Sequence, residues 1–114
     1  MITGYGPGWV SVNGEKIEHS VAISARGHRE VWPCNDFSSL CADHFTQLAD
    51  LQADLVIFGS GQRLRFPRPE WLQALVKKRI GVETMDTAAA CRTYNILAGE
   101  GRNVVVALLL EHRL

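Results

Sequence analysis

The chain has 114 residues, of which 46% are hydrophobic, so it has the length of one ordinary domain and apolar side chains for one sizeable core. Twelve basic and twelve acidic residues leave no net charge, which argues against general nucleic-acid binding. With no apolar run long enough to span a bilayer and no signal-peptide pattern at the start, we expect a single cytoplasmic domain, residues 1–114, without a membrane span.

The first predicted element is a β-hairpin over residues 8–24. The glycines and the proline before it indicate an irregular lead-in. Trp9 to Val12 reads as a short strand, and Asn13-Gly14 suits the positive backbone angles of a type I′ turn. Residues 15–24 are then expected to return as the antiparallel second strand.

The two-residue turn also fixes the register of this hairpin. Val12 is expected opposite Glu15 and Val10 opposite Ile17, so that Val10 shares an apolar face with His19. No acid or nucleophile is visible beside His19. We therefore interpret His19 as a half-buried sheet residue rather than a catalytic base.

Residues 25–37 show no sustained periodicity. A short strand is expected about Glu30 to Trp32. Pro33 follows, and since proline cannot donate to a ladder of hydrogen bonds, this strand belongs at the edge of a sheet.

An amphipathic helix is expected next, capped by Ser38 or Ser39. From Cys41 onward, apolar residues and Gln52 recur at i, i+4, i+7 and i+11. Cys41 and His44 could share a metal in principle, but two ligands fall short of the four of a structural zinc site. We expect no metal, and core packing explains Cys41 better.

The second half of the chain alternates strands with helices. Apolar runs such as Leu55 to Phe58 are typical of parallel strands covered on both faces. This alternation predicts an α/β core over residues 38–110, arranged in three layers around a central mixed sheet. The expected strands are 54–58, 80–85 and 103–110, and the expected helices are 69–79 and 87–98.

Two strand-to-helix joints form the candidate crevice, because ligands of open α/β sheets collect outside the carboxyl ends of the strands. Thr87 can cap the following helix, and Asp86 favours the positive end of its dipole. The same carboxylate can occupy the helix N-terminus and exclude an external anion. The candidate residues are Gly59, Ser60, Gly61, Asp86 and Thr87, with Arg63 or Arg92 to hold an anion.

No cofactor is expected at this crevice. The Gly-x-Gly of residues 59–61 lacks the third glycine and the immediate helix of a dinucleotide fingerprint. Cys91 lies about a turn inside the last helix among alanines, so buried packing explains it better than nucleophilic chemistry. With Cys34 and Cys41 it makes an odd number of cysteines, which indicates reduced thiols in a reducing compartment.

The run Gly81 to Leu97, with Asp54 to Gly61 upstream, resembles a small domain family of unknown function. This family includes an adipogenesis-associated protein and mitochondrial complex I assembly factor 3. The resemblance covers most of the chain and implies a three-layer α/β domain with a mixed sheet and no established catalytic residue. Two positions depart from the family's pattern, Ser60 where threonine is common and Arg79 where glycine is common, and Arg79 puts the helix ending in doubt.

Two functional classes remain open. A non-enzymatic binding or assembly-assisting domain, acting through protein–protein contacts, is favoured by the resemblance and by the lack of a visible nucleophile–base pair, metal cluster or complete cofactor loop. The alternative is a small-anion or metabolite-binding protein, or an enzyme, that uses the crevice at 59–61 and 86–87. An enclosed pocket where these groups meet favours the alternative, and exposed apolar side chains favour protein binding.

Overall fold

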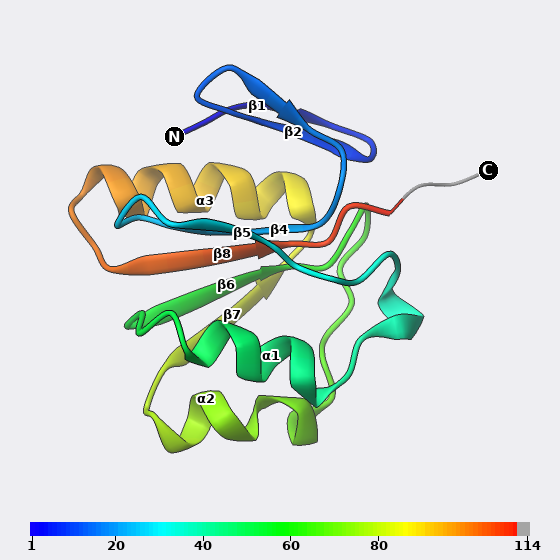
Figure 1. Cartoon of the computed structure of the whole chain (residues 1–114), viewed down its shortest axis with the longest axis vertical. Coiled ribbons are helices and arrows are strands. Elements are labelled where there is room, and N and C mark those ends of the chain that lie inside the picture. Colours follow the sequence, from blue (N-terminus) through cyan, green and yellow to red (C-terminus); the bar gives the residue numbers. More distant parts are fainter. Residues whose placement is uncertain (112–114) are drawn as a thin grey trace.

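The computed structural model describes residues 1–111, which form two β-sheets and three α-helices (Figure 1). The small antiparallel sheet contains β1 (Ile2–Gly6), β2 (Trp9–Val12) and β3 (Glu15–Ile17). The larger sheet contains β4 (Val21–Ser24), β5 (Arg29–Val31), β6 (Leu55–Gly59), β7 (Gly81–Met85) and β8 (Val104–Leu108). The α-helices are α1 (Ala42–Ala49), α2 (Gln73–Lys77) and α3 (Thr87–Gly99).

The larger sheet is mixed, as predicted, with the strand order β5-β4-β8-β6-β7. Strand β6 runs parallel to both of its neighbours, β7 and β8, whereas β4 is antiparallel to β8 and β5. All five residues of β8 are buried, which explains its continuous apolar sequence. The carboxyl ends of three parallel strands therefore meet at one edge of the sheet.

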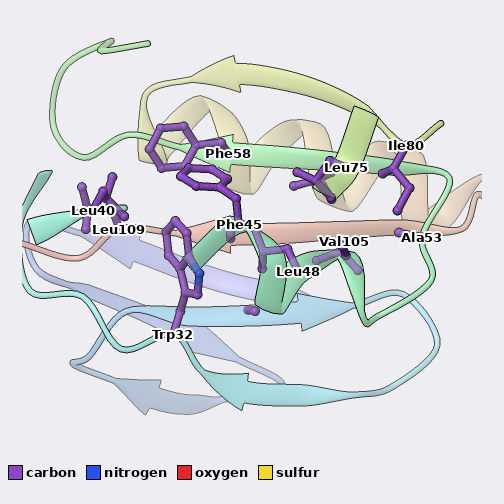
Figure 2. Close-up of a cluster of buried hydrophobic side chains, with 14 of the residues drawn as sticks. Trp32, Leu40, Phe45, Leu48, Ala53, Phe58, Leu75, Ile80, Val105 and Leu109 are labelled. Atoms are coloured by element: carbon purple, nitrogen blue, oxygen red, sulfur yellow. The ribbon is translucent and has the colours of Figure 1, made fainter. Parts of the chain in front are cut away.

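The larger sheet separates two hydrophobic cores, which confirms the layered α/β fold. Helices α1 and α2 cover one face, and α3 with the small sheet covers the other (Figure 1). In the first core, the rings of Trp32, Phe45 and Phe58 meet edge to face with centroids 5.4–5.8 Å apart (Figure 2). Such aromatic pairs add to the stabilisation that burial alone provides.

The hairpin prediction holds only for its first part. Asn13 and Gly14 adopt φ values of 50° and 87°, and the predicted register is confirmed. The second strand, however, ends at Ile17, because β4 pairs with β5 and β8 in the other sheet. Every side chain of β4 is buried, because both faces of the larger sheet are covered. A strand of a hairpin with one face in solvent would leave alternate side chains exposed. His19 lies exposed between the two sheets, so its predicted half-buried position is wrong.

The glycine-rich start forms a strand rather than an irregular lead-in. Strand β1 pairs antiparallel with β2, with Gly6 opposite Trp9. A Cβ atom at Gly6 would overlap the indole nitrogen of Trp9. Glycine, which reads as a strand breaker, is therefore the residue that lets the indole lie across this strand.

Three expected element boundaries shift for local reasons. Ser38 and Ser39 lie in a 3-10 helix (Phe37–Ser39) that Asp36 caps, and Cys41 is the N-cap of α1, so the serines do not cap that helix. Helix α1 ends at Ala49, short of Gln52. The expected helix 69–79 is a 3-10 helix (Pro69–Leu72) followed by α2. The expected edge strand is confirmed as β5.

Candidate functional site

A cavity of about 380 Å³ lies beyond the carboxyl ends of β6, β7 and β8. Its walls come from residues 61–62, 86–88 and 109–111, which follow the three strands, and from residues 5–8 at the end of β1 and in the turn before β2. Of the predicted crevice residues, Gly61, Asp86 and Thr87 line this cavity. The two predicted joints are adjacent because β6 and β7 are parallel neighbours.

Asp86 is the N-cap of α3. Its Oδ1 accepts the backbone N–H of Ala89 at 2.8 Å, which satisfies a donor that has no partner within the helix. The predicted structural role of this carboxylate is confirmed. It also places negative charge where an external anion would bind.

Thr87 does not cap the helix, and that part of the prediction is wrong. Its hydroxyl accepts the N–H of Gly61 at 2.9 Å and donates to the carbonyl of Leu109 at 3.0 Å. Its own N–H donates to the Gly61 carbonyl at 2.8 Å. One threonine thus joins the ends of all three parallel strands, which leaves its hydroxyl no simple role toward a ligand.

Gly59 and Ser60 lie behind the cavity wall. Ser60 is fully buried, and its hydroxyl donates to the Arg63 carbonyl at 2.8 Å and accepts the Arg65 N–H at 3.0 Å. A Cβ atom at Gly59 would lie 3.1 Å from the Cβ of Ala90, so the glycine permits the close approach of β6 to α3. Both residues serve the fold and are not presented to a ligand.

The two predicted anion-binding arginines do not line the cavity. Arg63 is exposed on the loop after β6. Arg92 is also exposed, and its guanidinium donates to the hydroxyl of Tyr5 at 2.9 Å, which raises the pKa of Arg92. The acidic groups Asp86 and Glu111 face the cavity instead. The predicted cationic half of the crevice is therefore not assembled.

Arg65 and Glu111 form an ion pair beyond the carboxyl ends of β6 and β8. This pair was not predicted from the sequence. The side chains are 22% and 16% exposed. Arg65 also donates to the Ser60 carbonyl at 2.6 Å, and Glu111 accepts the N–H of Phe37 at 3.0 Å. The pair lies 46 residues apart in sequence, so no local spacing announces it. Gly61, with φ of 103°, leaves the space that both side chains occupy.

Residues 63–68 are named here the arginine loop, and from Leu64 to Arg68 exposed positions alternate with half-buried or buried ones. Arg65 and Pro67 face the protein, whereas Leu64 and Phe66 are 52% and 69% exposed. The contacts of Arg65 with Ser60 and Glu111 hold the backbone between these apolar side chains. The loop therefore presents Leu64 and Phe66 on a fixed support.

The cysteines divide into two kinds. Cys91 is fully buried among the residues between α3 and the sheet, as predicted, and burial raises its pKa to about 12. Cys34 is also buried, with its pKa raised in the same way to about 12. Cys41 is exposed at the N-terminus of α1, so its predicted core packing is wrong.

Residues 1–111 contain neither a metal-binding cluster nor a membrane-spanning helix. No group of three or more histidine, cysteine, aspartate or glutamate side chains in this range could hold a metal ion. In the same range, no helix combines the length and the apolar character that crossing a bilayer requires.

The chain belongs to the family of proteins of unknown function DUF498/DUF598, whose family model matches residues 2–109. This match confirms the resemblance seen in the sequence. A solved structure of a protein from Bordetella parapertussis shares the fold with a TM-score of 0.91 at 39% identity. The alignment covers 97% of this chain and 95% of that one.

Two curated relatives illustrate the breadth of the family. The NADH dehydrogenase [ubiquinone] 1 alpha subcomplex assembly factor 3 of Danio rerio is 28% identical over 96% of this chain. The chain spans 63% of the length of that factor. An uncharacterised protein of Rhodobacter capsulatus is 37% identical over 95% of this chain, which spans 82% of that protein.

Proposed function

We propose that this chain is a non-enzymatic protein that assists assembly by binding another protein through the arginine loop. The relatives named as complex I assembly factors support the general role. They do not identify the partner of this chain. We further propose a cytoplasmic location, which the free thiols of Cys34, Cys41 and Cys91 support, because reduced cysteines are normal in a reducing compartment.

The exposure of Leu64 and Phe66 is the observation that carries this proposal. Solvent-exposed aromatic and aliphatic side chains are favourable anchors, because their burial against a partner removes apolar surface from water. Their support is already rigid, since Arg65 is tied to Ser60 and Glu111. A preorganised loop loses less conformational entropy on binding than a mobile one.

The hydrogen bonding of the strand ends supports the non-enzymatic part. The hydroxyls of Ser60 and Thr87 each donate and accept within the protein. One oxygen of Asp86 accepts the helix N–H, and both oxygens of Glu111 have partners. These groups hold the fold together, which limits their use as nucleophile or base.

Affinity capture from the native cells tests the proposal. The tagged wild type, a Leu64→Ser/Phe66→Ser double variant and a Val76→Ser control are compared, since Val76 is 67% exposed but belongs to α2 and not to the loop. We expect one or more proteins that wild type and control capture equally and that the double variant loses. Capture of the same proteins in the same amounts by all three would contradict the proposed surface.

The cavity supports a second candidate function, binding of a small metabolite. Its volume of about 380 Å³ lies within the range of small-molecule sites, roughly 300–1,000 Å³. Buried Leu109 and Leu110 provide an apolar wall, and Asp86 provides a carboxylate. A small anion is the less favourable ligand here, because the wall contains two carboxylates, Asp86 and Glu111, and no basic side chain among its lining residues.

A further inference from the structure

Cys41 and His44 form a thiol–imidazole pair on the surface, on the side of the molecule where α1 begins. The Sγ atom of Cys41 lies 3.6 Å from Nδ1 of His44. Cys41 is exposed, and His44 is half-buried one turn into α1. Neither residue lines the cavity, and neither is one of the apolar side chains of the proposed binding surface.

The surroundings of His44 fix which nitrogen carries the hydrogen. Its Nε2 lies 2.7 Å from the carbonyl of Pro33, and a carbonyl can only accept, so the neutral ring is protonated at Nε2. Nδ1 is therefore an acceptor, and it receives the N–H of Cys41 at 3.1 Å. Edge-on packing against Trp32, whose indole donates to the His44 carbonyl, holds the ring in place.

Helix capping alone explains part of this geometry. The Cys41 N–H and the His44 ring form one half of a capping box, a device that normally uses serine or threonine with glutamate or glutamine. Capping does not require a thiol, which is a weak acceptor, yet the ring nitrogen that accepts the Cys41 N–H also lies 3.6 Å from the exposed sulfur. An exposed thiol at a helix N-terminus beside a base is the usual setting of a reactive cysteine.

We propose that Cys41 is a modification site for low-molecular-weight disulfides, with His44 as the proton acceptor. The Cys41 proton passes to Nδ1, and the Sγ atom attacks one sulfur of the disulfide R–S–S–R. A Cys41–S–S–R bond forms as the original S–S bond breaks. The leaving thiolate takes up the proton and departs as R–SH. Cys41 is oxidised to a mixed disulfide, the leaving sulfur of the original disulfide is reduced to a thiol, and the number of disulfide bonds is unchanged.

The other two cysteines serve as controls within the same chain. Cys34 and Cys91 are buried, and burial raises the pKa of each thiol to about 12, so few thiolates form at neutral pH. A thiolate is the attacking species in this exchange. In the native chain, both should stay unmodified while Cys41 reacts.

Reaction of the full chain with oxidised glutathione, followed by intact mass and peptide mapping, tests the proposal. We expect a single glutathione adduct at Cys41 and no adduct in Cys41→Ser, which keeps a good helix cap. His44→Gln keeps a capping-box acceptor but removes the base, and should slow the reaction about tenfold or more. His19→Gln, which changes an exposed histidine elsewhere, should react like wild type.

Thermal melts establish that the variants are folded. If His44→Gln proves unstable, wild type provides a second test, since Cys41 should react faster in the native chain than in the urea-unfolded chain. A folded His44→Gln variant that reacts at the wild-type rate would overturn the proposal. So would first modification at Cys34 or Cys91, or a native rate for Cys41 no greater than the unfolded one.

Discussion

Thr87 and Gly61 are joined by two reciprocal hydrogen bonds across the ends of β7 and β6. The N–H of Thr87 donates to the Gly61 carbonyl at 2.8 Å, and the N–H of Gly61 donates to the Thr87 hydroxyl at 2.9 Å. The same hydroxyl reaches Leu109 beyond β8. Two residues of the predicted crevice therefore hold the ends of the parallel strands together.

Thr87→Val tests this role with little change in shape. The variant leaves the Gly61 N–H and the Leu109 carbonyl without the hydroxyl, so we expect the free energy of unfolding to fall by about 1–3 kcal/mol. Urea unfolding followed by tryptophan fluorescence measures it. Thr46→Val is the control, because that exposed hydroxyl only donates to Ala42 of its own helix. Equal losses of stability in both variants would contradict the role of Thr87 in joining the strand ends.

Asp86 variants separate capping from charge. Asp86→Ala removes the acceptor for the Ala89 N–H and should cost about 0.5–2 kcal/mol of stability. Asp86→Asn keeps an acceptor of comparable quality and should cost much less. Unfolding curves in urea compare the three proteins. Similar losses in both variants would mean that the negative charge, rather than the hydrogen bond, stabilises α3.

Phosphate tests the small-anion alternative with the same proteins. Because the Asp86 carboxylate occupies the helix N-terminus, we expect no phosphate-dependent rise in the melting temperature of wild type at constant ionic strength. Asp86→Ala opens that position. A phosphate effect that appears only in this variant means that Asp86 excludes anions from a latent site, whereas no effect in either protein rules out the anion site.

Alkaline pH should destabilise the protein through Cys91. Burial raises its pKa from 9.0 to about 12, so between these values the unfolded chain releases a proton that the folded chain keeps. Stability from this thiol is complete below pH 9 and falls by about 1.4 kcal/mol per pH unit above it. Urea unfolding at pH 7 and pH 10 should show a smaller decrease for Cys91→Ala than for wild type. Equal decreases would mean that the thiol ionises in the native state.

Arg79 offers a stabilising substitution. It adopts a φ of 57° just beyond Lys78, the C-cap of α2, a conformation that costs a non-glycine residue about 1–2 kcal/mol. Arg79→Gly removes this strain but adds freedom to the unfolded chain, so we expect a net gain of about 0.5 kcal/mol. Lys77→Gly, which changes the last helical residue of α2, should instead lower stability. A lower melting temperature for Arg79→Gly than for wild type would contradict the proposed backbone strain at Arg79.

Periodicity predicted the α/β half of the chain well, because the buried strands β6 and β8 are continuous apolar runs and a helical segment follows both β6 and β7. It failed at Val21–Ser24, where an alternating hairpin strand and a buried central strand share the same apolar residues. Pairing with β8, which lies more than eighty residues further along the sequence, decides between them, and no local pattern records that contact.

Parts of the candidate site were predictable for a similar reason. Asp86 lies directly before a helix, so its cap follows from local sequence. The pairing of Arg65 with Glu111 brings together residues that are far apart in sequence, so local sequence does not predict it. Arg65 points inward because its guanidinium also donates to the Ser60 carbonyl. The exposure of Cys41 follows from where α1 starts, one residue later than its apolar spacing suggests.

Calorimetric titration of a captured and purified partner tests the binding role of the arginine loop most directly. Wild type and the Val76→Ser control should bind with the same dissociation constant. The Leu64→Ser/Phe66→Ser variant should bind at least about tenfold more weakly, since anchor side chains typically contribute more than about 1 kcal/mol each. An unchanged dissociation constant for that variant, with its fold intact, would contradict the proposed binding surface.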